Sequence, residues 1–404
     1  MKVLLLPSWY IPQGGQFVRH QALALQEQGI DVAILANVAL PWHTYKAREL
    51  DLSRYPLHPI EQDETGIPTY RYYQRPIPRM PILNIRLWAR RTVKLYARYA
   101  QKHGHPDLIH VHSGTWGAYA AALIKEKWGI PYVVTEHRGM FGYKCELARR
   151  FFRPEFDEFF IKGFSHADCL IPVSDQLTAR MRTYCRREVP IRVVGNIVDT
   201  RYFDCAGRTA VAHEPFRFVS VNGYYEVKGY DILLKAWDLL CDRRGDAVLT
   251  IAGENFDQAA FQQMLARCRY RHLIRLTGEL PREGVKEELG KADAFVMSSR
   301  VEAAPVAILE ALSSGLPIVG TDVIPGYALT EKEGIRVGVE DPQALADGME
   351  RMMKERSRYL PEALHQHAVN IAAKEHIAGQ LIDIYRSVLN GELHNQAPVT
   401  VNLP

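Results

Sequence analysis

Short apolar runs rich in β-branched residues alternate along this chain with longer stretches of helical periodicity. Such alternation is typical of layered α/β domains with parallel sheets. It predicts two doubly wound sheets, with a ligand at the carboxyl ends of their strands in a cleft between them. The strands predicted in the first half are 3–6, 32–35, 108–111, 132–135, 169–173 and 192–194. Those predicted in the second half are 216–221, 248–251, 274–276, 294–297 and 318–320.

The length of 404 residues exceeds what one ordinary core accommodates. A polar linker near 196–207 marks the break between two domains. We therefore expect an N-terminal domain over 1–200 and a C-terminal domain over 201–371. A helix over 372–390 is expected to pack back toward the N-terminal domain, and the polar residues 391–404 to form a loose tail.

One predicted helix, over 82–101, has two contrasting sides. No acidic residue occurs between Tyr70 and Pro106, and basic residues recur on this helix at i+4 spacing. Two interpretations remain open: an ordinary solvated face, or a face that docks onto an anionic membrane or captures a phosphorylated acceptor. The spaced basic residues are Arg86, Arg90, Lys94 and Arg98, and the apolar side holds Ile85, Trp88, Thr92, Leu95, Tyr96 and Tyr99.

Composition narrows the class of protein. Hydrophobic residues make up 47% of the chain and charged residues 24%, as in soluble globular proteins. The net charge of +4 combines +9 over residues 1–200 (27 Lys and Arg against 18 Asp and Glu) with −5 over the remainder (23 against 28). A basic first half favours an anionic partner such as phosphate, membrane or nucleic acid. Because no nucleic-acid-binding module is recognised, nucleic acid is not expected as the partner.

The cysteines and the apolar runs suggest a cytosolic protein. Six cysteines are scattered without a Cys-x-x-Cys pair, which favours reduced thiols over a disulfide or zinc framework. The first apolar run ends at Pro7 and is too short for a signal peptide. No stretch approaches the ~20 apolar residues of a membrane-spanning helix.

Two carboxylates eight positions apart give the strongest chemical signal. Glu302 follows the predicted strand 294–297, and Glu310 lies within an apolar run that begins a helix. A buried carboxylate needs a partner, because an unpaired buried charge is costly, and a pair of ligand hydroxyls is one such partner. The alternative is a Glu favoured by the helix dipole together with an incidental second Glu.

Three further positions suit a ligand at strand ends. Gly14 and Gly15 lie between the first strand and a helix, where glycines allow close approach of the backbone to a ligand. Lys228 lies at a helix start, where its positive charge suits an anionic ligand. His137 ends the predicted strand 132–135, a place that favours function over a structural role.

The histidines at the end of the preceding strand, His110 and His112, resemble a metal pair. No third ligand is placed beside them, so a metal site is not predicted.

In combination these motifs resemble the retaining glycosyltransferases of family 4 (group 1 type). Those enzymes have the GT-B fold, in which two Rossmann-like domains face each other across a cleft. One family motif has a Glu, seven further residues, Glu-Ala and then Gly-x-Pro-Val. A second motif is Lys-Gly-x-Asp-x-Leu-Leu. The matching stretches here are 302–311, 315–319 and 228–234.

The resemblance implies roles for residues on both domains. His137, Glu302 and Lys228 would be catalytic, and His112 and Arg138 would lie on the acceptor side. The donor would be bound by Gly14, Gly15, Lys228, Gly253, Gly278, Leu280, Glu302, Ala303, Ala304, Val306 and Glu310.

The chain departs from the family text at several positions. Ser298 replaces the usual Pro, and Ala303 and Ala304 replace Gly-Phe. The family normally has a phosphate-binding Arg five residues before the Lys, where this chain has Gly223. Arg300 and Arg138 are the candidates to supply the missing positive charge.

The resemblance implies transfer of a hexose from a nucleotide sugar to a sugar or lipid-linked acceptor in cell-surface polysaccharide or glycolipid biosynthesis. The anomeric configuration would be retained. A UDP-sugar is favoured and a GDP-sugar is possible, and without an Asp-x-Asp motif we expect no metal and no other cofactor. The expected location is cytoplasmic, with a peripheral position on the inner face of the cell membrane.

Two alternatives stay open. One is a nucleotide-sugar epimerase of the same fold, which would need no second sugar. The other is a catalytically inactive sugar-nucleotide-binding module, which the loss of Arg at Gly223 would favour. A Rossmann dehydrogenase is disfavoured, because no Gly-x-Gly-x-x-Gly follows the first strand.

Overall fold

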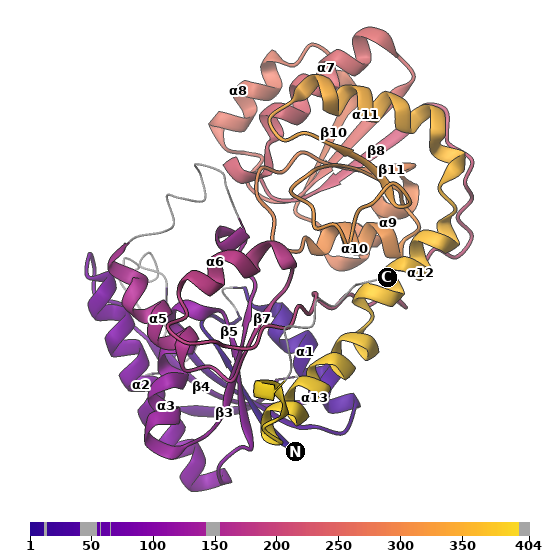
Figure 1. The fold of residues 1–404 in the computed structure, drawn as a ribbon. Helices are drawn as coiled ribbons and strands as arrows, with labels where there is room; N and C mark the ends of the chain where they lie inside the picture. The colour runs from indigo at the N-terminus through magenta and orange to yellow at the C-terminus, as the bar shows by residue number, and fades with distance from the viewer. Residues whose placement is uncertain (12–13, 41–54, 57, 65, 143–153, 396–404) are drawn as a thin grey trace. The chain divides into compact units, whose positions relative to one another are not determined.

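The computed structural model describes the chain except residues 12–13, 41–54, 57, 65, 143–153 and 396–404. Its described part divides into two compact units (Figure 1). The first unit combines residues up to Ile197 with the chain from Ile377 onward, and the second runs from Val198 to His376. The chain therefore passes from one unit to the other twice.

The first unit is built on a seven-stranded sheet of order β3-β4-β2-β1-β5-β6-β7. Every pairing is parallel except that of β3 with β4, which is antiparallel. The strands are β1 (Lys2–Pro7), β2 (Asp31–Ala39), β3 (Ile60–Glu64), β4 (Ile67–Gln74), β5 (Leu108–His112), β6 (Tyr132–Glu136) and β7 (Cys169–Pro172).

Five of the six strands predicted for the first half are confirmed, and the sixth prediction is wrong. Residues 192–194 form no strand, and only the preceding Ile191 pairs, in an isolated bridge to Leu170. Strands β3 and β4 were not predicted, because β4 buries polar side chains such as Thr69 and Arg71 that hide its hydrophobic alternation.

Helices cover both faces of this sheet. They are α1 (Gln16–Glu27), α2 (Pro81–His103), α3 (Tyr119–Trp128), α5 (Asp157–Ser165), α6 (Thr178–Thr183) and, from the far end of the chain, α13 (Lys374–Leu389). Short π or 3-10 turns are η2 (Gly114–Ala118), η3 (Gly139–Gly142), η4 (Pro154–Phe156), η5 (Asp175–Leu177) and η9 (Glu392–Asn395).

The C-terminal helix α13 belongs to the core of the first unit. Its residues Ile377, Leu381 and Tyr385 are buried in the same cluster as Val18 and Leu25 of α1, and Figure 1 shows the two helices side by side. The chain then continues into η9, where Leu393 is also buried. The prediction of a loose tail is therefore wrong up to residue 395, and 396–404 lie outside the described residues.

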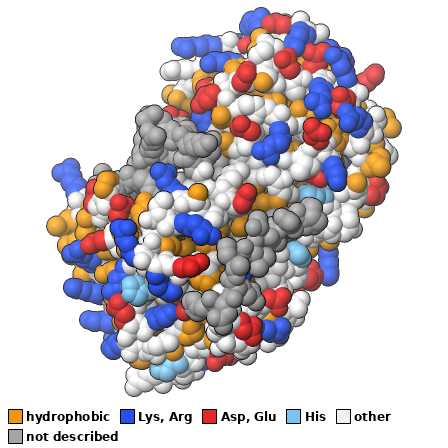
Figure 2. Space-filling view, viewed as in Figure 1, with side chains coloured by type: hydrophobic (Ala, Val, Ile, Leu, Met, Phe, Trp, Pro, Cys, Tyr) orange, Lys and Arg blue, Asp and Glu red, His pale blue; other side chains and the backbone are white. Residues whose placement is uncertain are grey.

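Helix α2 has the two sides that its sequence predicts. Ile85, Trp88, Leu95, Tyr96 and Tyr99 are buried. All four spaced basic residues are exposed, and Figure 2 shows blue side chains spaced along the margin of the first unit where α2 lies in Figure 1. One of the four is paired on the surface with α5, at 2.8 Å between Arg86 Nη2 and Glu158 Oε1.

The second unit has a six-stranded, wholly parallel sheet of order β10-β9-β8-β11-β12-β13. Its strands are β8 (Phe216–Val221), β9 (Ala247–Ala252), β10 (Ile274–Gly278), β11 (Ala294–Met297), β12 (Ile318–Thr321) and β13 (Gly334–Val337). The five strands predicted here are confirmed, and β13 was not predicted. The helices are α7 (Tyr230–Arg243), α8 (Ala259–Arg267), α9 (Arg282–Lys291), α10 (Val306–Ser313), α11 (Pro342–Glu355) and α12 (Pro361–Ala372). The 3-10 turns are η6 (Glu226–Lys228), η7 (Arg271–Leu273) and η8 (Arg356–Arg358).

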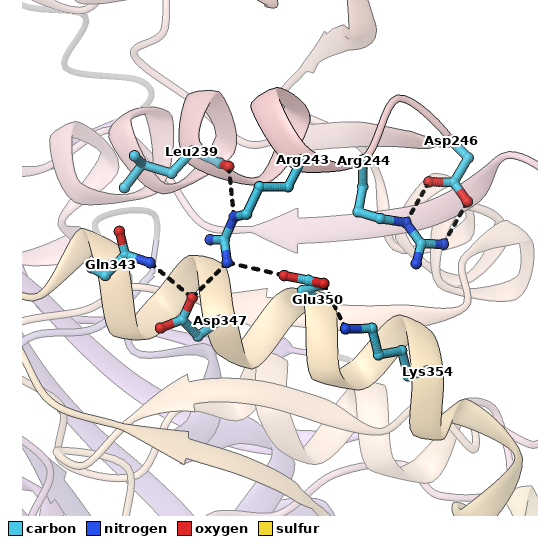
Figure 3. A network of polar contacts seen from close by, with 8 residues as sticks. All are labelled: Leu239, Arg243, Arg244, Asp246, Gln343, Asp347, Glu350 and Lys354. Atoms are coloured by element: carbon cyan, nitrogen blue, oxygen red, sulfur yellow. Dashed lines mark hydrogen bonds and ion pairs between the residues drawn. The ribbon is translucent and has the colours of Figure 1, made fainter.

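Helices α7 and α11 pack side by side, and Figure 3 shows the ionic network between them. Arg243, the last residue of α7, donates to Asp347 at 2.8 Å and to Glu350 at 2.9 Å. Lys354 donates to the other oxygen of Glu350 at 2.6 Å. Because these side chains are partly exposed, the network contributes modestly to stability. It lies at the opposite end of α7 from the strand-end loops described next.

Candidate active site

All strands of the second sheet run in one direction, so their carboxyl ends share one edge. The loops after β8, β9, β10 and β11 meet there, and most of the donor residues that the resemblance implies lie on them. We call this edge, formed by residues 222–229, 253–255, 278–280 and 298–310, the second-unit edge.

Lys228 and Glu302 are brought together at the second-unit edge. The Nζ of Lys228 donates to Glu302 Oε1 at 2.7 Å, and both side chains are largely buried. Between them, Gly229 begins α7 with φ of 65°, and a Cβ there would overlap the carbonyl oxygen of Ser298. Glycine is therefore required for the loop after β11 to approach the start of α7.

Glu310 lies on α10, one helix turn inside its start. Pro305 is the N-cap residue of that helix. The Glu310 side chain makes no hydrogen bond or ion pair with any residue in the described part of the chain, and it keeps some exposure. Burial raises the pKa of Glu310 to about 7, and the positive charge of Arg282 opposes that rise. A partly buried carboxylate without a partner is thus available to a ligand.

The other donor positions at the second-unit edge are mostly small residues. Ala303 and Ala304 are buried in the loop before α10, whereas Val306 is exposed. Gly253 packs so closely on Asn222 that a Cβ would overlap its carbonyl oxygen. The other two donor positions follow β10: Gly278 has φ of +73° and Leu280 is half-buried.

The position of the missing Arg is filled by a neighbouring pair. The hydroxyl of Tyr225 donates a hydrogen bond to Glu254. A Cβ on Gly223 would lie 2.8 Å from each of these two side chains. Arg300 does not replace the missing charge freely, because its guanidinium is held by Asp231 at 2.9 Å and by Glu340 at 2.5 Å.

The equivalent edge of the first unit lies at the ends of β1, β5 and β6. Gly15 begins α1 with φ of 79°, and Gly14 before it is exposed. Phe17 in the first turn of α1 packs on His137, with ring centroids 4.0 Å apart. We call this region, formed by residues 8–9, 14–17, 112–115 and 135–138, the first-unit edge.

A buried cluster of histidines lies behind His137. His112 Nδ1 is 3.1 Å from His137 Nε2, and His137 Nδ1 is 3.2 Å from Asn196 Oδ1. His112 is buried, so it differs from the prediction that it lines the acceptor side. His110 packs on His112 and bonds at 2.6 Å to the hydroxyl of Tyr385.

The same edge contains a buried ion pair that sequence reasoning did not find. Glu136 accepts hydrogen bonds from Ser113 Oγ, from the amide of Gly114 and from the guanidinium of Arg138. Burial alone would raise the pKa of Glu136, but the charge and hydrogen bonds of Arg138 bring it below the usual value. Arg138 also donates to Thr115, so its charge is already engaged within the first unit.

Neither edge shows a metal site. Among the described residues, no group of three or more His, Cys, Asp or Glu side chains is arranged to hold a metal ion. In the same part of the chain, no helix is both long and apolar enough to cross a bilayer.

Comparison with known proteins defines the class. The family model described as "Glycosyltransferase Family 4" matches residues 14–202, and that described as "Glycosyl transferases group 1" matches residues 207–374. The chain belongs to this family of glycosyltransferases, as its motifs predicted.

Its relatives include glycosyltransferases of bacterial polysaccharide biosynthesis. TuaC of Bacillus subtilis (strain 168), named for teichuronic acid biosynthesis, is 26% identical over 87% of this chain and 89% of its own length. AmsK of Erwinia amylovora, named for amylovoran biosynthesis, is 27% identical over 67% of this chain and 68% of its own.

Solved structures confirm the GT-B fold. Sucrose-phosphate synthase from Thermosynechococcus elongatus superimposes with a TM-score of 0.76 at 18% identity, over 97% of this chain and all of that chain. HepE of Anabaena, solved in complex with UDP, has a TM-score of 0.72 at 15% identity, over 96% and 100% of the two chains.

Proposed function

We propose that this glycosyltransferase transfers a hexose from a UDP-sugar to a glycan or lipid-linked acceptor in polysaccharide biosynthesis, with retention of configuration and without a metal. The observation that carries the assignment of a nucleotide donor is Glu310, a carboxylate without a partner in the described structure at an edge that already pairs Lys228 with Glu302. Two ribose hydroxyls are matched donors for such a carboxylate. In support, HepE was solved with UDP and with UDP-glucose, and TuaC and AmsK are named for polysaccharide synthesis.

The proposed chemistry gives a role to each predicted catalytic residue. Lys228 would stabilise the departing diphosphate, Glu302 would orient Lys228 and contact the sugar, and His137 would contact the transferred sugar. The acceptor would be oriented for attack on the same face that the diphosphate leaves, so catalysis is largely electrostatic and positional.

Thermal-shift measurements with UDP, GDP and UDP-glucose test the donor. A ligand that binds the native state alone raises the unfolding temperature in proportion to the logarithm of its concentration over Kd. We expect UDP and UDP-glucose to stabilise the protein more than GDP, with no change when EDTA is added. Stabilisation by GDP alone, or a requirement for Mg²⁺, would contradict the proposed donor and its mode of binding.

Acceptor dependence separates this function from the two alternatives. A transferase releases UDP faster when glycan or lipid-linked acceptors are added, and the anomeric signal of the product by NMR reports whether configuration is retained. An epimerase would change the sugar without an acceptor. An inactive module would bind UDP-glucose and release nothing.

We also propose that the basic side of α2 docks the protein onto an anionic membrane. Arg86, Arg90, Lys94 and Arg98 are exposed on it, and the segment leading into α2 adds exposed apolar side chains, of which Met80 is 48% exposed. Each basic residue near a charged bilayer contributes ~1 kcal/mol. Such attraction is screened within ~8–10 Å at physiological salt.

Sedimentation with anionic and neutral vesicles tests this docking. Binding to anionic vesicles should fall as salt rises and fall again when all four basic residues are changed to Gln. A wild-type protein that ignores anionic vesicles at low salt would assign this face to solvent or to a soluble phosphorylated acceptor.

A further inference from the structure

Both ring nitrogens of His137 are engaged inside the first unit. Nδ1 is 3.2 Å from Asn196 Oδ1, and Nε2 is 3.1 Å from His112 Nδ1. Phe17 covers one face of the ring at 4.0 Å. The ring is thus fixed on three sides, so its chemistry depends on which nitrogen carries the proton.

The partners of the ring determine the position of that proton. The Asn196 oxygen accepts, so His137 Nδ1 must donate and its Nε2 must accept a hydrogen bond from His112 Nδ1. His112 Nε2 then keeps a lone pair, and it is buried with no hydrogen-bond partner in the part of the chain that the structure describes. The opposite assignment would leave a buried N–H without an acceptor, which is the rarer and costlier defect.

A second layer keeps His112 from turning. His110 lies against it, with ring centroids 4.4 Å apart, and bonds at 2.6 Å to both Thr135 Oγ1 and the hydroxyl of Tyr385. Tyr385 comes from α13, 275 positions along the chain from His110. The C-terminal helix therefore closes the buried end of the cluster.

The surroundings keep these three histidines neutral. Burial lowers the pKa of His137 to about 4 and that of His110 to about 3, and it also holds the pKa of His112 well below its usual value. The nearest charged groups, Glu136 and Arg138, are paired with each other. Proton uptake by His137 near neutral pH is thus disfavoured.

We propose that Asn196 and His112, with His110 and Tyr385 behind them, are positioning residues, which hold His137 in the neutral tautomer with the proton on Nδ1 and make it an orienting group instead of a general base. The proposal rests on the proposed contact of His137 with the transferred sugar, which the ring would make through its carbon edge or its other face, because both nitrogens are engaged within the first unit. It adds that the C-terminal helix, through Tyr385, helps to fix the position of the His137 ring.

The direct test is the tautomer itself, read from side-chain ¹⁵N chemical shifts of the free protein labelled at histidine, with His137→Gln to assign the signals. We expect Nδ1 of His137 to be protonated and Nε2 to be unprotonated from pH 6 to pH 8. Protonation at Nε2 in the wild type would overturn the proposal. The tautomer is measured without any activity, so a failure of this proposal can be distinguished from a failure of the proposed function.

Two variants then test the positioning. His112→Phe removes the donor to His137 Nε2 at similar size and should loosen the ring and shift its Nε2 signal, while Asn196 still favours the proton on Nδ1. His112→Leu is the second variant if the first fails to fold. The rate of UDP release from UDP-glucose should fall about tenfold in either variant, with KM for UDP-glucose unchanged. Unchanged His137 signals, or unchanged release together with altered signals, would overturn the role.

Tyr385→Phe removes one hydroxyl and keeps the core packing. It should shift the His110 signals and slow UDP release two- to threefold. The matched control is Tyr132→Phe, which removes another buried hydroxyl of the same unit, one that donates to the Gly163 carbonyl at 2.6 Å. The control should leave the His137 and His110 signals unchanged. If both variants move these signals equally, the effect is general destabilisation and the role of Tyr385 is refuted.

Discussion

The two strand-end edges differ in how their polar groups are satisfied. At the first-unit edge the carboxylate of Glu136 accepts hydrogen bonds from four residues, and both nitrogens of His137 are engaged. At the second-unit edge Lys228 has its partner, but Glu310 has none among the described residues. Hydrogen bonds hold Glu136 and His137 in fixed positions, whereas a carboxylate without a partner is free to bind. The comparison suggests that the first unit orients and the second unit binds.

Replacing His137 tests the orienting edge and has the largest expected effect. His137→Ala should lower UDP release from UDP-glucose roughly 100-fold or more, while the Kd for UDP stays near that of the wild type, because the contact acts mainly in the transition state. Calorimetry with UDP and a rate assay measure the two effects. Equal losses in binding and in rate would remove the distinction between the edges.

Replacing Glu310 tests the binding edge. Glu310→Gln removes the charge at nearly constant size and should weaken UDP binding by ~1.5–3 kcal/mol, or about tenfold to a hundredfold. The matched variant is Glu254→Gln, which lies at the same edge but already has Tyr225 as its partner. A Kd that is unchanged in Glu310→Gln would end the ribose assignment.

The pH dependence of UDP binding sharpens the same assignment. With a pKa of about 7 in the free protein, Glu310 is mostly protonated at pH 6 and mostly ionised at pH 8. Because ribose hydroxyls donate to the ionised form, wild-type affinity should rise about tenfold over this range. The Glu310→Gln variant should show no such rise.

The raised pKa of Glu310 also affects stability: the free energy of unfolding should fall as pH rises, whereas the affinity for UDP should increase. The folded protein holds the proton of Glu310 more tightly than the unfolded chain, so this group destabilises the fold as pH rises from about 4.5 to about 7. The unfolding temperature of Glu310→Gln should therefore exceed that of the wild type at pH 8 and match it at pH 5. A difference that is constant with pH would mean that the carboxylate is solvated.

The smallest effect is expected far from either edge. Arg243→Gln breaks the surface network between α7 and α11 (Figure 3) and should lower the free energy of unfolding by ~0.5–1 kcal/mol. Arg243 ends the helix that Gly229 begins, so this variant also tests whether the network affects ligand binding at the second-unit edge. A weakened Kd for UDP in this variant would show that it does.

The sequence predicted most of the second-unit edge, because its residues are adjacent in short motifs. The ion pair of Lys228 with Glu302 joins two such motifs. The loss of Arg at Gly223 was visible in the sequence, but the Tyr225–Glu254 pair beside it was not, since that contact crosses from the loop after β8 to the loop after β9.

The first-unit edge was predicted less fully for the same physical reason. His137 was found from its place after a strand, but its partners come from distant parts of the chain, and Asn196 and Tyr385 lie 59 and 248 positions from it. Glu136 adjoins His137 but was not predicted as part of the site, because the sequence around a carboxylate in a buried strand does not indicate which residue pairs with it. Pairing across a fold leaves no local pattern in the sequence.

The return of α13 to the first unit decides how the chain can be divided into fragments. A fragment that ends at residue 197 lacks the buried side chains of Ile377, Leu381 and Tyr385, and so would expose an apolar groove and leave His110 without one of its two partners. A fragment over 198–376 contains its whole sheet and its own core. Domain expression is therefore feasible for the second unit by one excision, whereas the first requires residues 377–395 to be joined to its end by a linker.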